Sequence, residues 1–482
     1  MEINERRKIL AGGKLRKLRN DLSLSQSAMA SELGVSVSYL NLIERNQRPV
    51  TAQLLIKLSE TYDVDPRAFA QDDEQRTTSA CEEIFADALF QGTTVPRSEI
   101  RILTNDLPTV TGAMQRLYDA YVQLRDSGLS HVGQTSEGER GGVLASRNGN
   151  DPVETLREFL QRSNNHFPEL EDFAENLVVE MRVGNESIYA AVTARLHNMH
   201  NIRIQVLPVD VMGNLLKRYD MHRRKLMFSE LLEPAATAFQ AAFHLALVEA
   251  GPLLDRLAEK ASDHGSTRKL ARIMLANYLA AAVMMPYQAF FTAAEQLAYD
   301  VDILAARFSA SYEQVAHRLT TLARPSARGV PFFMVRIDDA GNVSKRFSSG
   351  SFPFARYGGT CPRWKIHSCF RNPGRTETQM LELPDGGKWF SIARTVQRAA
   401  TVWGEQGAQF AIGLGCEVKY AHRLVYGHGL DLKNPEATPI GVNCRLCERP
   451  NCAQRAAPPS LRPLDVNENL RGPSPFDADL KV

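Results

Sequence analysis

The chain lacks any long hydrophobic run. A helix that crosses a bilayer needs about 20 consecutive apolar residues. The longest apolar run here, YLAAAVMM from Tyr278 to Met285, ends at Pro286. The N-terminal segment MEINERRKILAGGKLRKLRN is charged and has no apolar stretch of the kind that a secretory signal requires. These absences argue against a membrane-bound or secreted class and predict a cytoplasmic protein.

The sequence also lacks a charge imbalance. It has 57 Lys and Arg against 55 Asp and Glu, a formal net charge of +2 over 482 residues. That balance excludes a histone-like polycation and an acidic tail protein. Apolar residues make up 44% and charged residues 23%, as in ordinary folded chains, and the length predicts roughly three domains.

Cysteine is scarce and unevenly distributed. The chain has seven Cys, and six of them follow residue 360. In a reducing cytoplasm such residues are free thiols or metal ligands more often than disulfides. A glycine-rich phosphate loop is missing, because GGT before Cys361 and GG at 386–387 are too short to form one. The cysteine cluster is therefore the first candidate functional feature.

Composition divides the chain into four ranges. Residues 1–70 start with seven Lys and Arg between Arg6 and Arg19. Residues 71–152 predict a helical linker or dimerisation region that ends in a flexible linker. The helical part covers 81–125 with a break near Pro108, and the flexible linker covers 126–152. Residues 153–325 predict a mainly helical domain. Residues 326–482 contain the β-type runs FFMVRID, KWFSIARTV and FAIGLGC and predict an α+β sensor domain.

Residues 8–69 carry a helix-turn-helix pattern. Ser25 is placed to cap a helix over SQSAMASEL, and Gly34 is placed to end that helix in a left-handed turn. Ser36 is placed to cap the next helix. A closing helix, AQLLIKLSETY, supplies further apolar residues to a small core. The expected apolar face of the second helix consists of Val37, Leu40 and Ile43.

The polar face of this pattern suits double-stranded DNA. A short helix docked by its apolar face enters the major groove and presents polar side chains to base edges, while neighbouring arginines fix the register on phosphates. A helical docking domain without a nucleic-acid role is the alternative, but spacing and surface chemistry agree on DNA. The side chains that we expect to contact or orient toward DNA are Gln26, Ser36, Ser38, Tyr39, Asn41, Arg45 and Arg48.

The same segment resembles a known family. SQSAMASELGVSVSYLNLIERNQRPV is similar to the lambda-repressor-like, or XRE-type, DNA-binding domain in its helix lengths, its glycine turn and its Ile-Glu-Arg-x-x-Arg-Pro exit. The resemblance covers about one seventh of the chain. It implies an all-α DNA-binding domain at the N-terminus.

The middle range resembles the zinc-peptidase-like (IrrE/ImmA-like) segment that follows XRE modules in some regulators. Proteolysis by such a domain needs His-Glu-x-x-His on one helix, with two His on the metal and the Glu as general base. In AFQAAFHLALVE, Gln240 and Ala241 stand at the first His and Glu positions, and only His244 remains. An amide and a methyl group cannot supply a ligand and a base. We therefore expect no catalytic residue and no enzymatic activity.

The run NCRLCERPNC places three cysteines in C-x2-C-x4-C spacing, and these are Cys444, Cys447 and Cys452. Three thiolates need a fourth ligand to hold zinc or an iron–sulfur cluster, and spacing alone does not separate the two. A third interpretation of the three cysteines is that they are reactive thiols without a metal, activated by neighbouring arginines. The candidates for the fourth ligand are Cys361, Cys416 and Cys369, or His367 and His422 for zinc.

The cysteine-rich range resembles the C-terminal domain of the short-chain fatty acyl-CoA regulators. The motifs that carry the resemblance are GGTCPRWKIHSCFRNPG, GLGCEVKYAHRLVYGHGLDL and PIGVNCRLCERPNCAQRAAPP. Together with the two preceding matches, the resemblance spans nearly the whole chain. It implies an acyl-CoA effector and a 4Fe–4S cluster on Cys444, Cys447 and Cys452, with either Cys361 or Cys416 as the fourth ligand.

An acyl-CoA pocket requires cations for phosphates and apolar walls for a short acyl chain. All three Trp lie in the C-terminal range, where they suit a ligand cavity and equally a small core. The residues expected to bind the ligand are Arg363, Trp364, Lys365 and Arg394. Further available cations and walls are Arg356, Arg371, Trp389, Phe390 and Trp403.

The expected fold is therefore multidomain: an all-α lambda-repressor-like helix-turn-helix, a mainly helical middle domain and an α+β sensor domain. The expected function is a bacterial transcriptional regulator of short-chain acyl-CoA metabolism that responds to an acyl-CoA. The alternatives are a redox-sensing regulator whose cluster is the signal and a zinc-stapled regulator with another ligand. A homodimer or higher homo-oligomer is expected, since paired helix-turn-helix units read two half-sites, and helices over 81–125 are the candidate interface.

Overall fold

The structure is a computed structural model of the chain. It describes residues 11–22, 24–62, 71–90, 93, 95–130, 152–181, 187–354, 360–397, 404, 407–432, 435–450 and 452–459. Its contacts form two compact units. The first contains Met1–Asn150, Ser351–Cys361 and Gly441–Val482, and the second contains Asp151–Gly350 and Pro362–Ile440. This division differs from the four expected ranges, since the end of the 326–482 range groups with the N-terminal unit.

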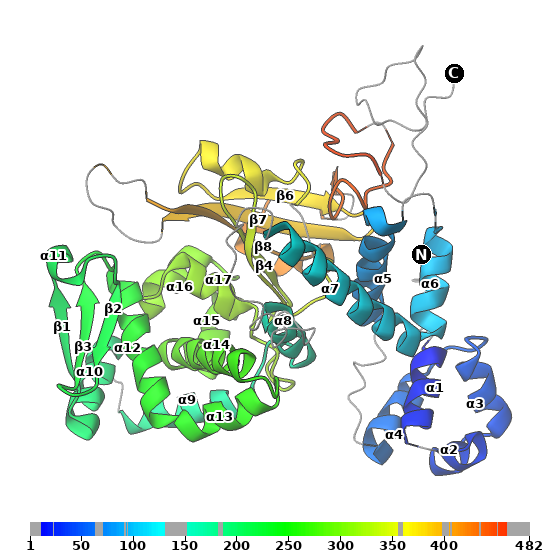
Figure 1. The fold of residues 1–482 in the computed structure, drawn as a ribbon, viewed down its shortest axis with the longest axis horizontal. Coiled ribbons are helices and arrows are strands. Elements are labelled where there is room, and N and C mark those ends of the chain that lie inside the picture. The colour runs from blue at the N-terminus through cyan, green and yellow to red at the C-terminus, as the bar shows by residue number, and fades with distance from the viewer. Residues whose placement is uncertain are drawn as a thin grey trace, which may run out of the picture. The chain divides into compact units, whose positions relative to one another are not determined.

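The first unit is helical (Figure 1). The helix-turn-helix core is followed by three further α-helices, the last two of which meet at Pro108. Leu107, before that proline, leaves the helical conformation with φ −128° and ψ 55°, because a proline restricts the residue before it. The break expected near Pro108 is confirmed. The elements are α1 (Gly12–Asp21), α2 (Gln26–Glu32), α3 (Val37–Glu44), α4 (Ala52–Tyr62), α5 (Gln71–Phe85), η2 (Ala88–Phe90), α6 (Arg97–Asp106) and α7 (Pro108–Ser130).

Helix α7 continues to Ser130, into the range 126–152 where a flexible linker was expected. The next described helix begins at Pro152, and residues 131–151 lie outside the described residues. The first part of the expected linker, up to residue 130, is therefore helical, and the prediction was wrong there. Glycine at 128 does not end the helix, because a single glycine costs a helix only about 1 kcal/mol.

The second unit starts with a helical layer. Proline at the first turn of α9 and α12, and Ser187, Asp300 and Ser311 as N-caps, mark helix starts that the sequence specifies locally. The helices are α8 (Pro152–Arg162), α9 (Pro168–Glu180), α10 (Ile188–His200), α11 (Val209–Met212), α12 (Pro234–Glu249), α13 (Gly251–Glu259), α14 (Gly265–Met284), α15 (Tyr287–Gln296), α16 (Val301–Phe308) and α17 (Tyr312–Leu319).

Two sheets accompany these helices. The smaller sheet has the order β1-β3-β2, with β1 parallel and β2 antiparallel to β3. The larger sheet has the order β5-β4-β8-β7-β6-β9. Its central strands coincide with the three β-type runs expected from the sequence. The strands are β1 (Arg203–Leu207), β2 (Lys217–Asp220), β3 (Lys225–Ser229), β4 (Phe333–Ile337), β5 (Val343–Ser348), β6 (Glu377–Glu382), β7 (Lys388–Gln397), β8 (Gln409–Glu417) and β9 (Thr438–Pro439), and the 3₁₀ turns are η4 (Lys365–Arg371), η5 (Val418–Arg423) and η6 (Val425–Gly427).

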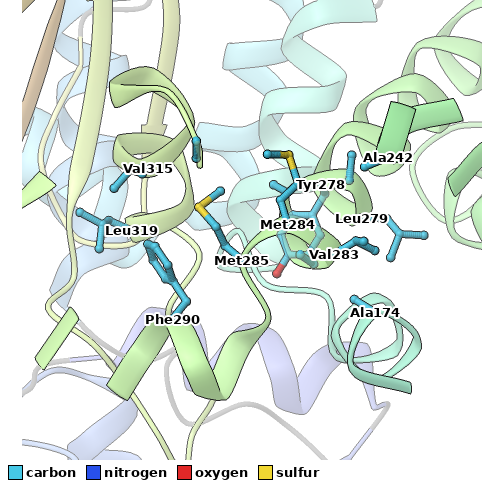
Figure 2. Close-up of a cluster of buried hydrophobic side chains, with 14 of the residues drawn as sticks. Ala174, Ala242, Tyr278, Leu279, Val283, Met284, Met285, Phe290, Val315 and Leu319 are labelled. Atoms are coloured by element: carbon cyan, nitrogen blue, oxygen red, sulfur yellow. The ribbon is translucent and has the colours of Figure 1, made fainter. Parts of the chain in front are cut away.

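A continuous hydrophobic core joins the helical layer to the larger sheet. Figure 2 shows part of it, where Met285, Phe290 and Leu319 lie together. The same cluster includes Phe390 of β7 and Cys416 of β8, both with no exposed surface. Helices and sheet therefore share one core in the second unit, although the sequence had predicted a boundary near residue 325.

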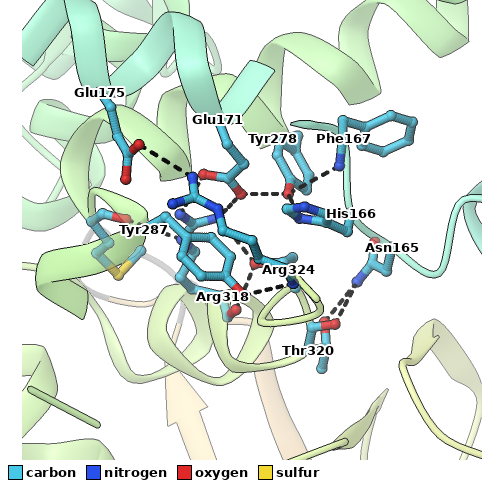
Figure 3. A network of polar contacts seen from close by, with 12 residues as sticks. Asn165, His166, Phe167, Glu171, Glu175, Tyr278, Tyr287, Arg318, Thr320 and Arg324 are labelled. Atoms are coloured by element: carbon cyan, nitrogen blue, oxygen red, sulfur yellow. Dashed lines mark hydrogen bonds and ion pairs between the residues drawn. The ribbon is translucent and has the colours of Figure 1, made fainter. Parts of the chain in front are cut away.

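The core contains a fully buried ion pair between Arg318 of α17 and Glu171 of α9 (Figure 3). Two guanidinium nitrogens donate to the two carboxylate oxygens at 2.6 and 2.8 Å. Tyr278 donates a third hydrogen bond to Glu171 at 2.5 Å, and Arg318 also donates to the Met285 carbonyl oxygen. The extra donors satisfy groups that would otherwise be buried without partners, which is the condition for a stable buried pair.

Among the described residues, no single helix is both long and apolar enough to pass a test for a membrane span. Helices α14 and α15 together have the length and apolar composition of a membrane span, but the chain bends by 63° between them.

Candidate functional site

The helix-turn-helix is formed by local capping. The Ser25 side chain accepts a hydrogen bond from the Ala28 backbone N–H at 3.1 Å. Ser36 accepts one from the Tyr39 N–H at the same distance. Gly34 has φ +62°, the left-handed conformation that lets the chain turn between α2 and α3. All three local predictions are confirmed.

Helix α3 packs against the small core through Leu40 and Ile43, both with no exposed surface. Val37, which we expected on the same apolar face, is 45% exposed, so that prediction was wrong. Val37 is the first residue of the helix, where the chain is still entering from the turn. The rest of the core comes mainly from Leu15, Met29, Ala30, Leu33, Leu54 and Leu58.

Apart from Gln26, the residues expected to contact DNA lie at the N-cap of α3, on α3 or in the turn after it, and they are exposed or partly exposed. Ser36, Ser38, Arg45 and Arg48 are exposed, and Tyr39 and Asn41 are partly exposed. The guanidinium of Arg48 lies 6.0 Å from the centre of the Tyr39 ring. The surface thus offers a hydroxyl, an amide and cations within one short helix and the turn after it.

Gln26 has a partner inside the domain. Its amide nitrogen donates to Glu44 Oε2 at 2.7 Å. Arg19 of α1 donates to both carboxylate oxygens of Glu44, at 2.7 and 3.2 Å. Glu44 is buried, so this network ties α1, the first turn of α2 and the end of α3 together. Sequence reasoning had counted Arg19 only as part of the basic cluster and had missed Glu44.

The turn after α3 also contacts α1 and α6. Asn46 has φ +56°, and its side-chain oxygen accepts from the Gly12 N–H at 2.8 Å. Its amide nitrogen donates to Asp106 of α6 at 2.7 Å. A Cβ on Gly13 would lie 1.9 Å from the Asn105 carbonyl oxygen, so α1 approaches α6 with no space for a side chain there. This contact was not predictable from local pattern.

Helices α6 and α7 carry apolar side chains on their exposed surface. Val110 is 52% and Leu117 is 73% exposed, and Ile102 and Leu107 are about half exposed or more. Tyr118 and Val122 instead pack with Ile84 of α5. The helical periodicity expected over 81–125 is present, but one part of its apolar surface has no partner within the described chain.

The degenerate peptidase motif lies on α12. Gln240 and His244 share one face because they are four residues apart on a helix. His244 is buried, and its Nε2 atom has no hydrogen-bond partner. Within the described ranges no group of three His, Cys, Asp or Glu side chains converges to hold a metal ion.

The cysteine loop is organised by an arginine. Arg455 is buried and donates to the carbonyl oxygens of Cys444 at 3.2 Å, Cys447 at 2.9 Å and Arg449 at 2.6 Å. The Ala456 N–H points at Cys444 Sγ at 3.5 Å. Cys361, Cys444, Cys447 and Cys452 all lie within the described residues, and no three of them converge there to hold a metal ion. Several thiols in one short loop are nonetheless the ligand type that zinc or an iron–sulfur cluster takes.

The candidates for a fourth ligand lie in different units. Cys361 belongs to the first unit, with the three loop cysteines, and is buried. Cys416 lies on β8 in the second unit, where burial raises the pKa of its thiol. Cys369 is also in the second unit, donates to the Lys365 carbonyl oxygen at 3.4 Å, and has its pKa raised by burial to about 11. His367 and His422 lie in the second unit as well.

Several of the residues expected to bind an acyl-CoA already make contacts within the second unit. Trp364 is buried and donates to Ser391 at 3.0 Å, and both Trp364 and Trp389 pack edge-on against Phe333. Trp364, Trp389 and Phe390 are thus core residues here. Lys365 donates to the Thr378 carbonyl oxygen, while Arg363 is partly buried.

The remaining arginines of that set differ in their contacts and exposure. Arg394 forms an ion pair with Asp302 and lies 5.0 Å from the centre of the Tyr312 ring. Arg371 is exposed. Arg356 and Trp403 lie outside the described residues.

Family models match three consecutive parts of the chain. They are a helix-turn-helix over residues 15–69, an IrrE N-terminal-like domain over 198–320, and the C-terminal domain of the short-chain fatty acyl coenzyme A regulators over 321–476. The resemblances seen in the sequence are confirmed.

Known proteins are similar to this chain over almost its full length. The HTH-type transcriptional regulator RamB of Mycobacterium tuberculosis is 39% identical over 97% of this chain and 98% of its own length. PrpR of the same organism is 36% identical over 97% and 96%. The propionyl-CoA carboxylase regulator of Cereibacter sphaeroides is 35% identical over 98% and 99%. A solved Mycobacterium tuberculosis transcriptional regulator matches 68% of this chain and 100% of its own, with a TM-score of 0.65 and 37% identity.

Proposed function

This chain belongs to the family of HTH-type transcriptional regulators that includes RamB and PrpR, and from that premise we propose that it binds promoter DNA and regulates short-chain acyl-CoA metabolism, of the propionyl-CoA or acetyl-CoA kind. The observation that carries the proposal is the capped α3 helix, which exposes polar side chains, together with the turn after it, which exposes Arg45 and Arg48. Its relatives are named as regulators, and its peptidase motif lacks the His-Glu pair, which supports a role without catalysis.

The proposal of DNA binding rests on the side chains that α3 and the turn after it expose. Ser38, Tyr39 and Asn41 are placed to reach base edges in the major groove, and Arg45 and Arg48 to reach the phosphates. Gln26 and Ser36 lie at helix N-termini, where backbone N–H groups favour an anion such as phosphate. The Arg19–Glu44 pair holds α3 against α1, so the reading side chains keep one orientation.

A homodimer is part of the proposal. Two helix-turn-helix units on a two-fold axis read half-sites one helical turn apart, so a self-complementary surface is needed. The exposed apolar residues of α6 and α7, Ile102, Leu107, Val110 and Leu117, supply such a surface next to α1. Analytical ultracentrifugation of Leu117→Glu is expected to show monomers where the wild-type chain sediments as a dimer, with Ile303→Glu, at an exposed apolar residue of α16, as the matched control.

The effector is proposed to be a short-chain acyl-CoA. An effector changes DNA affinity only if it binds the DNA-competent and incompetent states with different affinities. The family match over residues 321–476 supports this assignment. The expected ligand-binding cations are Arg363, Lys365 and Arg394, although Arg394 must release Asp302 to reach a phosphate.

A 4Fe–4S cluster is the proposed cofactor, with zinc as the alternative. Cys444, Cys447 and Cys452 would hold it, and Cys361 is the preferred fourth ligand because it belongs to the same unit. When bound, such a cluster supplies a structural crosslink and one-electron chemistry. Arg455 fixes the backbone of the loop, and the Ala456 N–H points at Cys444 Sγ.

The proposal is tested on the anaerobically purified full chain. Fluorescence anisotropy against fragments selected from genomic DNA is expected to show a specific site whose affinity changes with propionyl-CoA or acetyl-CoA and not with free acetate or propionate. Asn41→Ala is expected to weaken specific binding, while Lys269→Ala, at an exposed position of α14, leaves it unchanged. Failure to select any sequence would refute the DNA-binding role, and indifference to every acyl-CoA would refute the effector.

The cofactor is tested on the same preparation. Iron, acid-labile sulfide and zinc are measured per chain. About four iron and four sulfide per chain support the cluster. One zinc without sulfide supports the zinc-stapled alternative. A cluster whose loss changes DNA affinity while acyl-CoA does not would favour the redox-sensing alternative.

A further inference from the structure

The strand next to the degenerate peptidase helix carries a lysine on its inner face. In the antiparallel register of β2 and β3, Lys217 pairs with Phe228 and Tyr219 pairs with Leu226. Phe228 and Leu226 have no exposed surface. Because strand side chains alternate between faces, Lys217 and Tyr219 lie on the same face as these core residues. Figure 1 shows the small sheet beside α10 and α12.

Lys217 is placed where an ammonium group is costly. Its Nζ atom lies 4.1 Å from the centre of the Phe243 ring. Within the described part of the chain it makes no ion pair, and burial lowers its pKa to about 8. A ring face offsets only part of the desolvation of a cation. The remaining cost calls for an anion.

His244 supplies a second unpartnered group at the same place. Its ring lies 4.2 Å from the Tyr219 ring, between centroids, and its Nε2 atom is buried without a hydrogen-bond partner. Burial, then the charges of Lys217 and His200, lower its pKa to about 4. The neutral ring carries one N–H, which can be on Nε2 and donate to a ligand.

The groups around this face are mostly basic. His200 and Arg195 both contact Glu249, at 2.9 and 2.7 Å, so that carboxylate is already shared. The remaining Arg195 partner is Glu180 at 2.9 Å, which is exposed. Neither carboxylate contacts Lys217 or His244. The face therefore has a surplus of cationic groups and donors over acceptors.

We propose that Lys217 and His244 form an anion-binding site for a phosphate or carboxylate group, at the position where a peptidase of this fold holds its metal. Gln240 lies on the His244 face one turn away, and its amide can donate to the same anion. The Lys217 ammonium supplies the positive charge that a metal would have supplied, and its presence disfavours a cation there. Lys217 lies on an edge strand of the small sheet and is itself only partly buried, so its side chain remains in reach of solvent.

The test uses the full chain and simple anions. Isothermal titration calorimetry is performed with inorganic phosphate, pyrophosphate and acetate. Lys217→Met is expected to weaken binding of the preferred anion at least tenfold, which corresponds to about 1.4 kcal/mol. Arg218→Met is the matched control, because Arg218 is the next residue on the same strand and points to the opposite, exposed face. It is expected to change affinity less than twofold.

Thermal unfolding separates a ligand site from a structural lysine. Without anions, Lys217→Met is expected to unfold at a temperature equal to or above that of the wild-type chain, since a partly buried charge without an ion-pair partner is removed. With pyrophosphate or phosphate, only the wild-type chain and Arg218→Met are expected to gain stability. His244→Phe keeps the contact with Tyr219 and removes the donor, so it provides a second variant, with weaker anion binding expected.

The source of the anion is resolved by competition. If pyrophosphate displaces propionyl-CoA from the wild-type chain, the site takes a CoA phosphate, and otherwise it takes a separate small anion. The site stands independently of the acyl-CoA proposal, because its anion affinity is measured without CoA. Equal anion affinities of Lys217→Met and wild type would overturn it. So would the absence of binding by every tested anion at millimolar concentration.

Discussion

Arg19 and Glu44 are held together between the first and third helices, with the guanidinium donating to both carboxylate oxygens at 2.7 and 3.2 Å. Glu44 is the last residue of α3 and also accepts from Gln26. Arg16 donates to the Glu44 carbonyl oxygen at 2.7 Å. Two cations of the basic N-terminal cluster are thus used to build the DNA-binding domain, and are less available for phosphates than the sequence suggested.

Removal of the Glu44 charge is expected to destabilise this domain. Glu44→Gln leaves Arg19 partly buried without its counter-charge, which costs about 2–3 kcal/mol. Far-UV circular dichroism during heating should show earlier loss of the helix-turn-helix signal, together with weaker DNA binding. Glu32→Gln, which affects an exposed carboxylate, is the control. An unchanged melting profile for Glu44→Gln would contradict the stabilising role of the pair.

Base-reading and phosphate-contacting residues are expected to respond differently to salt. Asn41→Ala should cost about 1–3 kcal/mol on the specific site and little on random DNA. Arg48→Ala should weaken both, and should reduce the slope of log K against log salt by about 0.9 for each lost phosphate contact. Anisotropy titrations over a range of salt concentrations distinguish these outcomes. Loss of specificity in Arg48→Ala without a change in slope would reverse the assignment.

The buried Arg318–Glu171 pair is expected to dominate the stability of the second unit. Glu171→Gln leaves the Arg318 charge buried with only neutral partners, which costs about 3–5 kcal/mol. Glu175→Gln affects the more exposed pair with Arg324 and should cost under about 1 kcal/mol. Urea unfolding followed by near-UV circular dichroism compares the two. Similar losses in both variants would contradict the special role of the buried pair.

The same pair predicts how stability depends on pH. Burial by itself would raise the pKa of Glu171, but the Arg318 charge and the hydrogen bonds from Arg318 and Tyr278 outweigh it and lower that pKa. A carboxyl group whose folded pKa is lowered stabilises the fold above its unfolded pKa, which is near 4.3, and loses this contribution as pH falls through the folded value. Wild-type stability should therefore fall below about pH 4.3 more steeply than that of Glu171→Gln.

Cysteine substitutions test the proposed cofactor ligands. Cys361→Ser, Cys444→Ser and Cys447→Ser should each lower iron and sulfide per chain, because a cluster requires all of its thiolates. Cys416→Ser and Cys369→Ser should retain them, because burial raises the pKa of both thiols and both belong to the second unit. Iron loss in Cys416→Ser with normal folding would instead identify Cys416 as the fourth ligand.

Much of the DNA-binding surface could be read from the sequence. Ser25, Ser36 and Gly34 act within a few residues of themselves, so their roles are encoded locally and the structure confirms them. Val37 departs from the pattern because helical periodicity does not say where a helix becomes covered by its neighbours. Glu44 was missed because the partners that bury it, Arg19 and Gln26, are distant along the chain.

The sequence by itself determined the family, the positions of the main strands, the caps of the DNA-binding helices and the loss of the peptidase motif, because each depends on residue type and short spacing. Only the tertiary structure decided that Trp364 and Trp389 pack in a core, and that Cys361 belongs to the same compact unit as the cysteine loop. It also decided that Lys217 of β2 lies against Phe243 of α12, beside His244. These relationships join residues far apart in the chain. Burial and long-range pairing set them, and neither leaves a local pattern.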